Sequence, residues 1–300
     1  MICSILIPIY NRLAVTRQGL SSLYEGLDRY QQAGAGNCRF EVVVIDDGST
    51  DGSAEWIATN YPSIHICRGD GNLWWSGAIN MGADYAIDRL NSDYLLLWND
   101  DILAADDYFV RAAGLLAAPP RNTVFGSKIV VKENPAKTWS VGGFFDRVWG
   151  RYGLHTDAGE SPDGWFECDW QPGMGTFVPV DLLRQHDLRW DSVVFPQYHG
   201  DSDFTLRCKS KGIAVKTRLD LLIYNSSATS GLGKINNMNK LWLSLVSMRS
   251  NYNLRKRLLF YRRHGVIPLS YVGLGKMYFM YFGSFFKRTY VMPLLAPSTA

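Results

Sequence analysis

Two apolar segments that each end in polar, mostly acidic residues constrain the fold of this chain most strongly. The run Tyr94–Trp98 is followed by Asn99–Asp101, and the run Phe40–Ile45 is followed by Asp46–Asp47. Continuous apolar runs of this length are typical of strands buried on both faces of a parallel sheet. Open α/β sheets bind ligands at the carboxyl ends of such strands, so these side chains are expected at one binding edge.

Strand-like and helix-like segments alternate along the first hundred residues. Strands are predicted at 2–9, 40–45, 64–67 and 94–98, and helices at 16–29, 53–59 and 76–88. This alternation predicts an α/β fold with a doubly wound, mostly parallel central sheet flanked by helices. Further strands are predicted at 124–131, 138–141, 176–178, 213–216 and 221–224, with helices at 106–117, 180–186 and 202–211. Residues 142–173, rich in Gly, Asp and aromatic residues, are predicted to form an irregular loop.

The composition excludes several classes of protein. Hydrophobic residues make up 47% of the chain and charged residues 20%, which excludes global disorder. A net charge of only +3 does not favour nucleic-acid binding. The five cysteines form no CxxC pair, and the apolar start of the chain is too short for a signal peptide. These features predict a protein of the reducing cytoplasm.

Six motifs follow one another in a characteristic order. They are IPIYNR at 7–12, VVVIDDGSTDGS at 42–53, GNLWWSGAINMG at 71–82, LLLWNDDI at 95–102, QPGMGTFV at 171–178 and FPQYHGDSDFTLRCKSKG at 195–212. The order resembles family 2 glycosyltransferases, inverting enzymes with the nucleotide-sugar-binding GT-A fold. The resemblance covers residues 1–230, which are expected to form the catalytic domain. It is closest to bacterial members that add sugars, often rhamnose, to surface polysaccharides such as O-antigen and capsule.

The resemblance implies that the first four motifs bind the donor nucleotide. After the first strand, Pro8 gives a rigid turn and Tyr10 an aromatic face for the base. A carboxylate of Asp46 or Asp47 can accept a hydrogen bond from a pyrimidine or ribose, although Asp-Gly-Ser also turns a chain and caps a helix. The adjacent tryptophans Trp74 and Trp75 are expected to line the nucleotide or sugar pocket, with core packing of one of them as the alternative. The expected contacts are Pro8, Tyr10, Asn11, Arg12, Asp46, Asp47, Asn72, Trp74, Trp75, Asn80, Asn99 and Asp100.

The acidic cluster aligns with the D-x-D metal motif of the family. Because Asn99 replaces the first aspartate, Asp101 is the expected direct ligand of Mg²⁺ or Mn²⁺, ions that prefer carboxylates together with substrate phosphates. Asn225 stands where many relatives carry a histidine ligand. The diphosphate and water would then complete the metal shell, or a histidine would substitute. The candidate histidines are His155, His186 and His199.

Asp201 falls at the position of the catalytic base in the family's acidic motif. Inverting transfer needs one carboxylate that takes a proton as an acceptor hydroxyl attacks the anomeric carbon. The glutamate that usually precedes this base is replaced by Gly200. Alternatively, Asp201 and Asp203 only favour the positive end of the following helix. Arg207, one turn later, could pair with Asp203.

The C-terminal segment, residues 231–300, is basic and aromatic. The stretch Tyr271–Phe286 is apolar but interrupted by Lys276, which disfavours a membrane-spanning helix. An amphipathic helix lying on an anionic membrane surface is expected, with packing on the core or in a dimer interface as the alternative. The basic residues expected to contact lipid are Arg255, Lys256, Arg257, Arg262 and Arg263.

Together these features predict an inverting hexosyltransferase at the cytoplasmic face of the cell membrane. It would transfer sugar from dTDP-rhamnose or a UDP-sugar to a saccharide or lipid-linked saccharide. A non-catalytic nucleotide-sugar-binding scaffold is the alternative, supported by the neutral residues at 99, 200 and 225. A sugar-phosphate nucleotidyltransferase would need a Gly-rich loop with Arg and Lys after the first strand, which Pro8–Asn11 does not provide.

Overall fold

The computed structural model describes residues 1–34, 36–226 and 235–292 of the 300-residue chain. The chain divides into two compact units. Unit 1 comprises Met1–Phe144 and Leu154–Thr229, and unit 2 comprises Phe145–Gly153 and the chain from Ser230 onward. A short segment from the middle of the sequence therefore belongs with the C-terminal helices.

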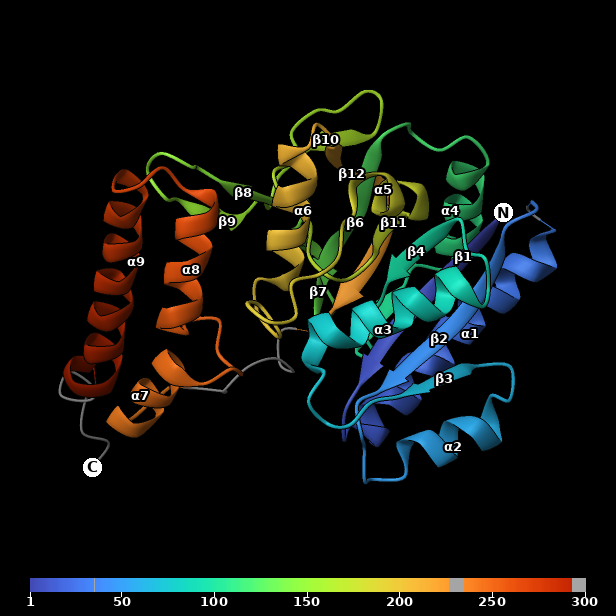
Figure 1. The fold of residues 1–300 in the computed structure, drawn as a ribbon, viewed down its shortest axis with the longest axis horizontal. Helices are drawn as coiled ribbons and strands as arrows, with labels where there is room; N and C mark the ends of the chain where they lie inside the picture. The colour runs from blue at the N-terminus through green and yellow to red at the C-terminus, as the bar shows by residue number, and fades with distance from the viewer. Residues whose placement is uncertain (35, 227–234, 293–300) are drawn as a thin grey trace. The chain divides into compact units, whose positions relative to one another are not determined.

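Unit 1 is built on one large sheet with the strand order β10-β12-β6-β11-β4-β1-β2-β3, with β5 beside β12 and β7 beside β6 (Figure 1). Strands β1, β2, β3 and β4 are mutually parallel, and β11 is antiparallel to both of its neighbours. The predicted, mostly parallel α/β sheet is confirmed. The strands are β1 Ile2–Ile9, β2 Arg39–Asp46, β3 His65–Arg68, β4 Tyr94–Leu97, β5 Ile102–Ala104, β6 Thr123–Val131, β7 Asn134–Ser140, β10 Trp165–Glu167, β11 Thr176–Pro179 and β12 Ala214–Asn225.

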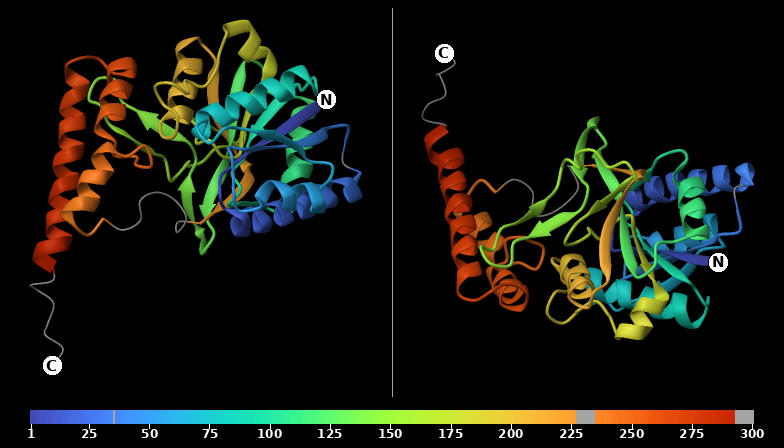
Figure 2. Two further views of the ribbon diagram at one scale, coloured as in Figure 1. Left: turned by 60° about the horizontal axis from the view of Figure 1, so that its bottom comes forward. Right: turned by 90° about the horizontal axis from the view of Figure 1, so that it is seen from above.

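Helices cover both faces of this sheet because its central strands are apolar on both sides. All four residues of β4 are buried. One core contains side chains of α1, α2 and α4, and the other contains side chains of α3, α5 and α6. Figure 2 shows the sheet between these helices from two further directions. The helices are α1 Leu13–Ala33, α2 Ser53–Asn60, α3 Trp74–Asp88, α4 Tyr108–Ala117, α5 Val180–His186 and α6 Gly200–Ser210.

Two predictions about residues 142–225 were wrong. The supposed loop at 142–173 contains β10 and the small two-stranded sheet of β8 (Gly143–Phe145) and β9 (Tyr152–Leu154). The two strands expected at 213–216 and 221–224 form one strand, β12, whose pairing with β6 shifts register between Arg218 and Leu222. The irregularity in β12 accounts for its appearance as two separate segments in the sequence.

Unit 2 contains α7 (Met238–Val246), α8 (Leu254–His264), α9 (Leu269–Phe286) and a closing π-helical turn at Lys287–Val291. Its interior is aromatic: Phe260 packs edge-on against Phe145 and Tyr152, and Tyr281 stacks on Tyr252. None of the helices within the described ranges has the length and apolar content of a membrane-spanning segment.

Arg257 does not have the surface position that the sequence suggested. Its side chain is buried, and its guanidinium donates to the backbone and side-chain oxygens of Asn251 at 2.8 and 3.0 Å. The same group lies over the rings of Tyr152 and Tyr252. Because helix α8 packs against the 145–153 segment on this side, Arg257 stabilises unit 2 and is not available to a lipid surface. The stretch 225–239 is rich in Ser, Gly and Asn, a composition that predicts a linker, and it lies in part outside the described residues.

Candidate active site

The loops that follow β1 and β2 are joined to each other at the carboxyl edge of the sheet. The backbone N–H of Thr50 donates to the side-chain oxygen of Asn11 at 2.8 Å, and that of Asn11 donates to Ser49 Oγ at 2.9 Å. The backbone N–H of Leu13 donates to Asp51 Oδ2 at 2.8 Å. The first two predicted nucleotide-binding motifs therefore form one continuous, hydrogen-bonded surface.

Asp47 holds the loop that leads into α3. Its Oδ1 accepts hydrogen bonds from the backbone N–H groups of Gly71 and Leu73 at 2.9 and 3.1 Å. Its Oδ2 accepts one from Trp74 at 3.0 Å. A carboxylate with three backbone donors is well satisfied without a ligand, so the structure gives Asp47 a loop-anchoring role. Its contact with the nucleotide stays a prediction.

Trp75 connects this loop to the predicted catalytic base. Its backbone N–H donates to the Gln197 side chain at 3.2 Å. Its ring occupies the space that a Cβ on Gly173 would take, and a Cβ on Gly200 would come within 3.4 Å of it. The backbone N–H of Gly173 in turn donates to Asp201 Oδ2 at 3.0 Å. The motifs at 71–82, 171–178 and 195–212 therefore pack together beside Asp201.

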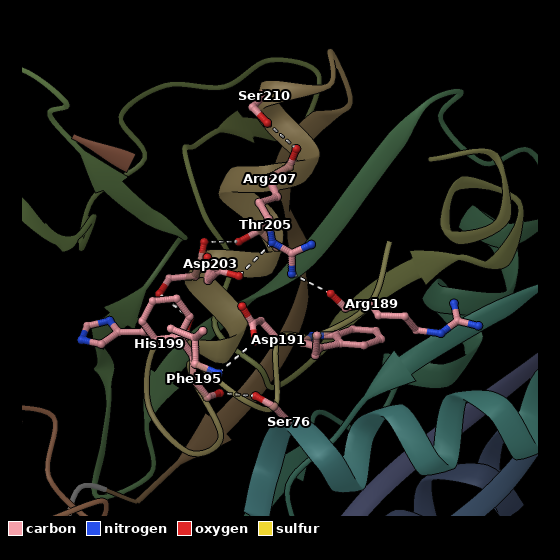
Figure 3. A network of polar contacts seen from close by, with 12 residues as sticks. Ser76, Arg189, Asp191, Phe195, His199, Asp203, Thr205, Arg207 and Ser210 are labelled. Carbon is pink, nitrogen blue, oxygen red and sulfur yellow. Dashed lines mark hydrogen bonds and ion pairs between the residues drawn. The ribbon is translucent and has the colours of Figure 1, made fainter. Parts of the chain in front are cut away.

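Gly200 replaces the expected glutamate for a packing reason. A Cβ at this position would overlap the side-chain oxygen of Ser76 on α3. That oxygen donates to the backbone oxygen of Phe195 at 2.6 Å (Figure 3). Helix α3 and the start of α6 approach so closely that only glycine fits without displacement of Ser76.

The Asp201 carboxylate is held by backbone donors, and the residue is only partly exposed. Ser202 N–H donates to its Oδ1 at 2.7 Å, and Gly173 N–H to its Oδ2. Burial raises the pKa of Asp201 above its ordinary value of 3.8, while these hydrogen bonds oppose the rise. A fixed carboxylate whose proton affinity is increased by burial is suited to general-base catalysis.

Asp203 has the structural role that its spacing suggested. It is buried, and its Oδ2 accepts from Arg207 Nε at 2.8 Å, one helical turn along α6. The guanidinium of Arg207 also donates to the backbone oxygen of Arg189 at 2.6 Å (Figure 3). This network fixes the first turn of α6, on which Asp201 lies.

The acidic cluster after β4 is bridged by Arg12 from the loop after β1. Arg12 Nη1 lies 3.0 Å from Asp100 Oδ1, and Nη2 lies 2.8 Å from Asp101 Oδ2. Thr16 Oγ1 donates to Asp100 Oδ2 at 2.8 Å. Burial raises the pKa of Asp100 to about 6, and Arg12 opposes this effect. Helix α1 touches this segment directly, since a Cβ on Gly19 would overlap the backbone oxygen of Asp100.

The cluster has the chemistry of a cation site with few protein ligands. The guanidinium of Arg12 already places positive charge between Asp100 and Asp101. Asn225 pairs with Ile102 across β12 and β5, so the residue at the expected histidine position does come beside the cluster. In the part of the chain that the structure describes, no three His, Cys, Asp or Glu side chains gather to hold a metal, so His155, His186 and His199 belong to no such group. A divalent ion fits here when the donor diphosphate supplies further ligands.

Other predicted nucleotide contacts lie at the same edge. Tyr10 is 44% exposed, Asn72 is exposed, and Pro8 and Trp74 are partly buried. The side chain of Asp46 is buried, and its Oδ1 accepts from the backbone N–H of Ser49 at 2.8 Å. The exposed residues are available to a ligand, whereas Asp46 shapes the turn beneath them.

Sequence reasoning gave Asn80 a nucleotide contact and missed three residues that organise the site. The Asn80 side chain makes two hydrogen bonds to the backbone of Trp190: its NH2 group donates to the carbonyl oxygen at 2.8 Å, and its oxygen accepts from the N–H at 3.1 Å. Its observed role is therefore to hold α3 against that segment. Thr16, Gly173 and Gln197 were not singled out. Gly173 and Gln197 lie in the fifth and sixth motifs, which was their sequence signal, whereas Thr16 had none. The need for glycine at 173 depends on the Trp75 ring.

Comparison with known proteins decides the family. A sequence model described as Glycosyl transferase family 2 matches residues 4–171, more than half of the chain. The chain belongs to glycosyl transferase family 2. The matched region contains the first four motifs, the acidic cluster and the start of the fifth motif, and the predicted resemblance is confirmed.

One curated relative is the low-salt glycan biosynthesis hexosyltransferase Agl10 of Haloferax volcanii, 36% identical over 62 residues. This match spans 21% of the chain and 20% of Agl10. Among solved structures, the mannosyltransferase PcManGT from Pyrobaculum calidifontis, in complex with GDP-Man and Mn²⁺, has a TM-score of 0.56 at 16% identity, covering 92% of this chain and 69% of that one. S. aureus TarS 1–349 in complex with UDP has a TM-score of 0.51 at 15% identity, covering 76% and 61%. These similarities show a shared GT-A-like fold.

Proposed function

We propose that this family 2 member is an inverting glycosyltransferase that uses a nucleoside-diphosphate sugar. The acceptor hydroxyl attacks the anomeric carbon on the face opposite the leaving nucleoside diphosphate. Asp201 takes the hydroxyl proton, the new glycosidic bond forms as the bond to the diphosphate breaks, and the configuration inverts. The packing of Trp75 against Gly173 and Gly200, together with the hydrogen bond from Gly173 to the Asp201 carboxylate, is the observation that carries this proposal.

The donor side of the site is formed by the joined loops after β1 and β2 and by the loop that Asp47 anchors. Asp101, with Asn99 in the same motif, would hold Mg²⁺ or Mn²⁺ together with the diphosphate. Such an ion would neutralise the negative charge of the leaving group. PcManGT, a protein of similar fold, was solved with Mn²⁺, which supports a divalent ion here.

A panel of donors identifies the nucleotide. We expect dTDP-rhamnose or a UDP-sugar with Mg²⁺ or Mn²⁺ to raise the Tm, because a ligand that binds only the folded state adds about 2.7 kcal/mol at a hundred times its Kd. Thermal shift is measured against GDP-sugars and the free nucleoside diphosphates. Absence of any shift with every nucleotide would contradict a donor site at this edge.

The pH dependence of transfer reports the protonation of Asp201. Only the ionised carboxylate can accept the proton, and burial raises the pKa of Asp201 above 3.8. Transfer is therefore expected to decline on acidification at a pH above the ordinary aspartate range. The measurement is kcat/KM against pH with saturating metal. A rate that stays constant through pH 4 would argue against this role for Asp201.

Transfer is proposed to take place at the cytoplasmic membrane face, onto a saccharide or lipid-linked saccharide of a surface polysaccharide. Support comes from the basic C-terminal segment, in which Arg255, Arg262 and Arg263 are exposed. Each basic residue near an anionic leaflet contributes about 1 kcal/mol of binding. Agl10, a hexosyltransferase of low-salt glycan biosynthesis, is in keeping with this acceptor class.

A further inference from the structure

Charge is divided very unequally between the two units. Unit 2 contains thirteen Lys and Arg residues and one acidic residue, Asp146, which gives a formal charge of +12. Unit 1 contains the remaining eighteen basic and twenty-seven acidic residues, which gives −9. No Asp or Glu follows Asp220 in the sequence. A unit of this charge attracts anionic surfaces and repels a second copy of itself.

One surface of unit 2, which we term the apolar cap, combines two segments that are far apart in the sequence. It consists of the turn between β8 and β9 and, beside it in Figure 1, the segment that leads into α9 together with the first turn of α9. Each apolar side chain in it is between 40% and 63% exposed. The residues of the apolar cap are Val148, Trp149, Val266, Ile267, Leu269 and Val272.

The two halves of the apolar cap are fixed to each other by their backbones. The N–H of Val266 donates to the backbone oxygen of Arg147 at 2.7 Å. A Cβ on Gly273 would overlap the backbone oxygen of Trp149, and one on Gly150 would overlap that of Ser270. Both glycines therefore allow the turn and the start of α9 to approach closely, which brings their exposed apolar residues together on one surface.

The turn itself is ordered by the acidic residue of unit 2. Asp146 Oδ1 accepts from the backbone N–H groups of Val148 and Trp149, at 3.0 Å each. The other oxygen of Asp146 lies 3.0 Å from Arg151 Nη2, in an ion pair that cancels its charge. The exposed Val148 and Trp149 are thus held in a fixed turn. Their transfer from water to an apolar surface therefore requires little further loss of conformational entropy.

We propose that the apolar cap is the part of the protein that inserts into the interface of an anionic lipid bilayer. Exposed Arg262 lies three residues before Gly265, at the end of α8 and next in sequence to the cap, where it would meet lipid phosphates. The apolar cap belongs to a strongly basic unit, and this combination matches an anionic bilayer, in which negatively charged headgroups lie above an apolar acyl region. The inference rests on the membrane association proposed above and names the surface responsible.

A comparison of matched variants tests the cap. The double substitution Val148→Ser with Trp149→Ser, made in the full chain, is expected to weaken binding to phosphatidylcholine–phosphatidylglycerol vesicles about tenfold or more. The controls are Trp242→Ser and Phe279→Ser, which remove side chains that are 65% and 80% exposed on α7 and α9 of the same unit. These controls are expected to bind the vesicles like the unsubstituted protein. All variants should keep the donor-induced rise in Tm, which shows that they are folded.

Each other outcome overturns a separate part of the proposal. Loss of binding in the controls but not in the cap variant would assign lipid contact to the α7 or α9 surface. If the unsubstituted protein binds neither anionic nor neutral vesicles yet transfers sugar, membrane association fails and the proposed transfer stands. If sedimentation shows a self-association that only the cap variant loses, and vesicles are not bound, the apolar cap is an interface between copies of the chain.

Discussion

Replacing Asp201 with asparagine is expected to lower the rate of sugar transfer by about 10²- to 10⁴-fold. The amide keeps the size and planarity of the carboxyl group, and one of the N–H groups of Ser202 and Gly173 keeps an oxygen acceptor while the other faces the amide NH2. Basicity is lost, so no group takes the proton of the acceptor hydroxyl. Because the substitution leaves the donor loops untouched, the Kd for the nucleotide is expected to change little. The experiment measures kcat with saturating donor and the Kd of the nucleoside diphosphate.

Asp203→Asn is the matched control for this prediction. Asp203 lies two residues further along α6 and is engaged with Arg207, so its substitution removes a buried ion pair. We expect a lower Tm with kcat within a few-fold of the unsubstituted protein. If Asp201→Asn turns over near the normal rate, or if both variants lose activity equally together with stability, Asp201 is not the base.

The sequence predicts the first half of the fold well because each element there follows one simple rule. Strand β1 is predicted at residues 2–9 and found at Ile2–Ile9, since a β-branched run buried on both faces has no other stable placement. Strand β4 is similarly clear. The strands β5, β8 and β9 each have only three residues. Strand β5 pairs with β12, which is distant in the sequence, and β8 pairs with β9 across a short turn. No local pattern of hydrophobicity can identify such strands.

The motifs predict which segments of the chain meet, but they do not predict which side chains face a ligand and which hold the loops in place. Asp46 and Asp47 were expected to contact the nucleotide, and each holds a loop by accepting backbone hydrogen bonds. Gly200 was a departure from the family pattern, and its reason became visible only with Ser76 beside it. Such contacts depend on tertiary packing, which spacing along the chain does not encode.

The roles of side chains in the C-terminal segment also depend on tertiary packing. Its basic composition is plain in the sequence, yet composition did not distinguish Arg257, which is buried between two tyrosine rings, from exposed Arg262. Nor could it show that the turn containing Trp149, about a hundred residues earlier, packs with this segment. Composition gives the net charge of the segment, whereas the fold decides which of its basic residues are exposed.

Replacing Asp101 with alanine is expected to weaken metal-dependent binding of the donor by about 10- to 100-fold. Asp101 stands at the last position of the metal motif, and the diphosphate needs a cation to offset its charge beside Asp100 and Asp101. Asn99→Ala should cost less, because a neutral amide is the weaker ligand. Isothermal titration with the nucleoside diphosphate, with Mn²⁺ and with EDTA, measures the metal-dependent part of the affinity.

Asp106→Ala provides the control, because this aspartate is close in sequence but its side chain is 91% exposed and pairs with Arg29. It should bind the donor normally at every metal concentration.

Arg12 gives a further distinction: in Asp101→Ala its guanidinium loses one of its two carboxylate partners, while Asp100 keeps Arg12 and Thr16. The Tm without ligand should therefore fall only slightly, so that lost donor affinity reports the missing metal ligand and not unfolding. Unchanged donor affinity in Asp101→Ala, or activity that survives EDTA, would exclude a metal at this site and leave Arg12 as the cation that faces the diphosphate.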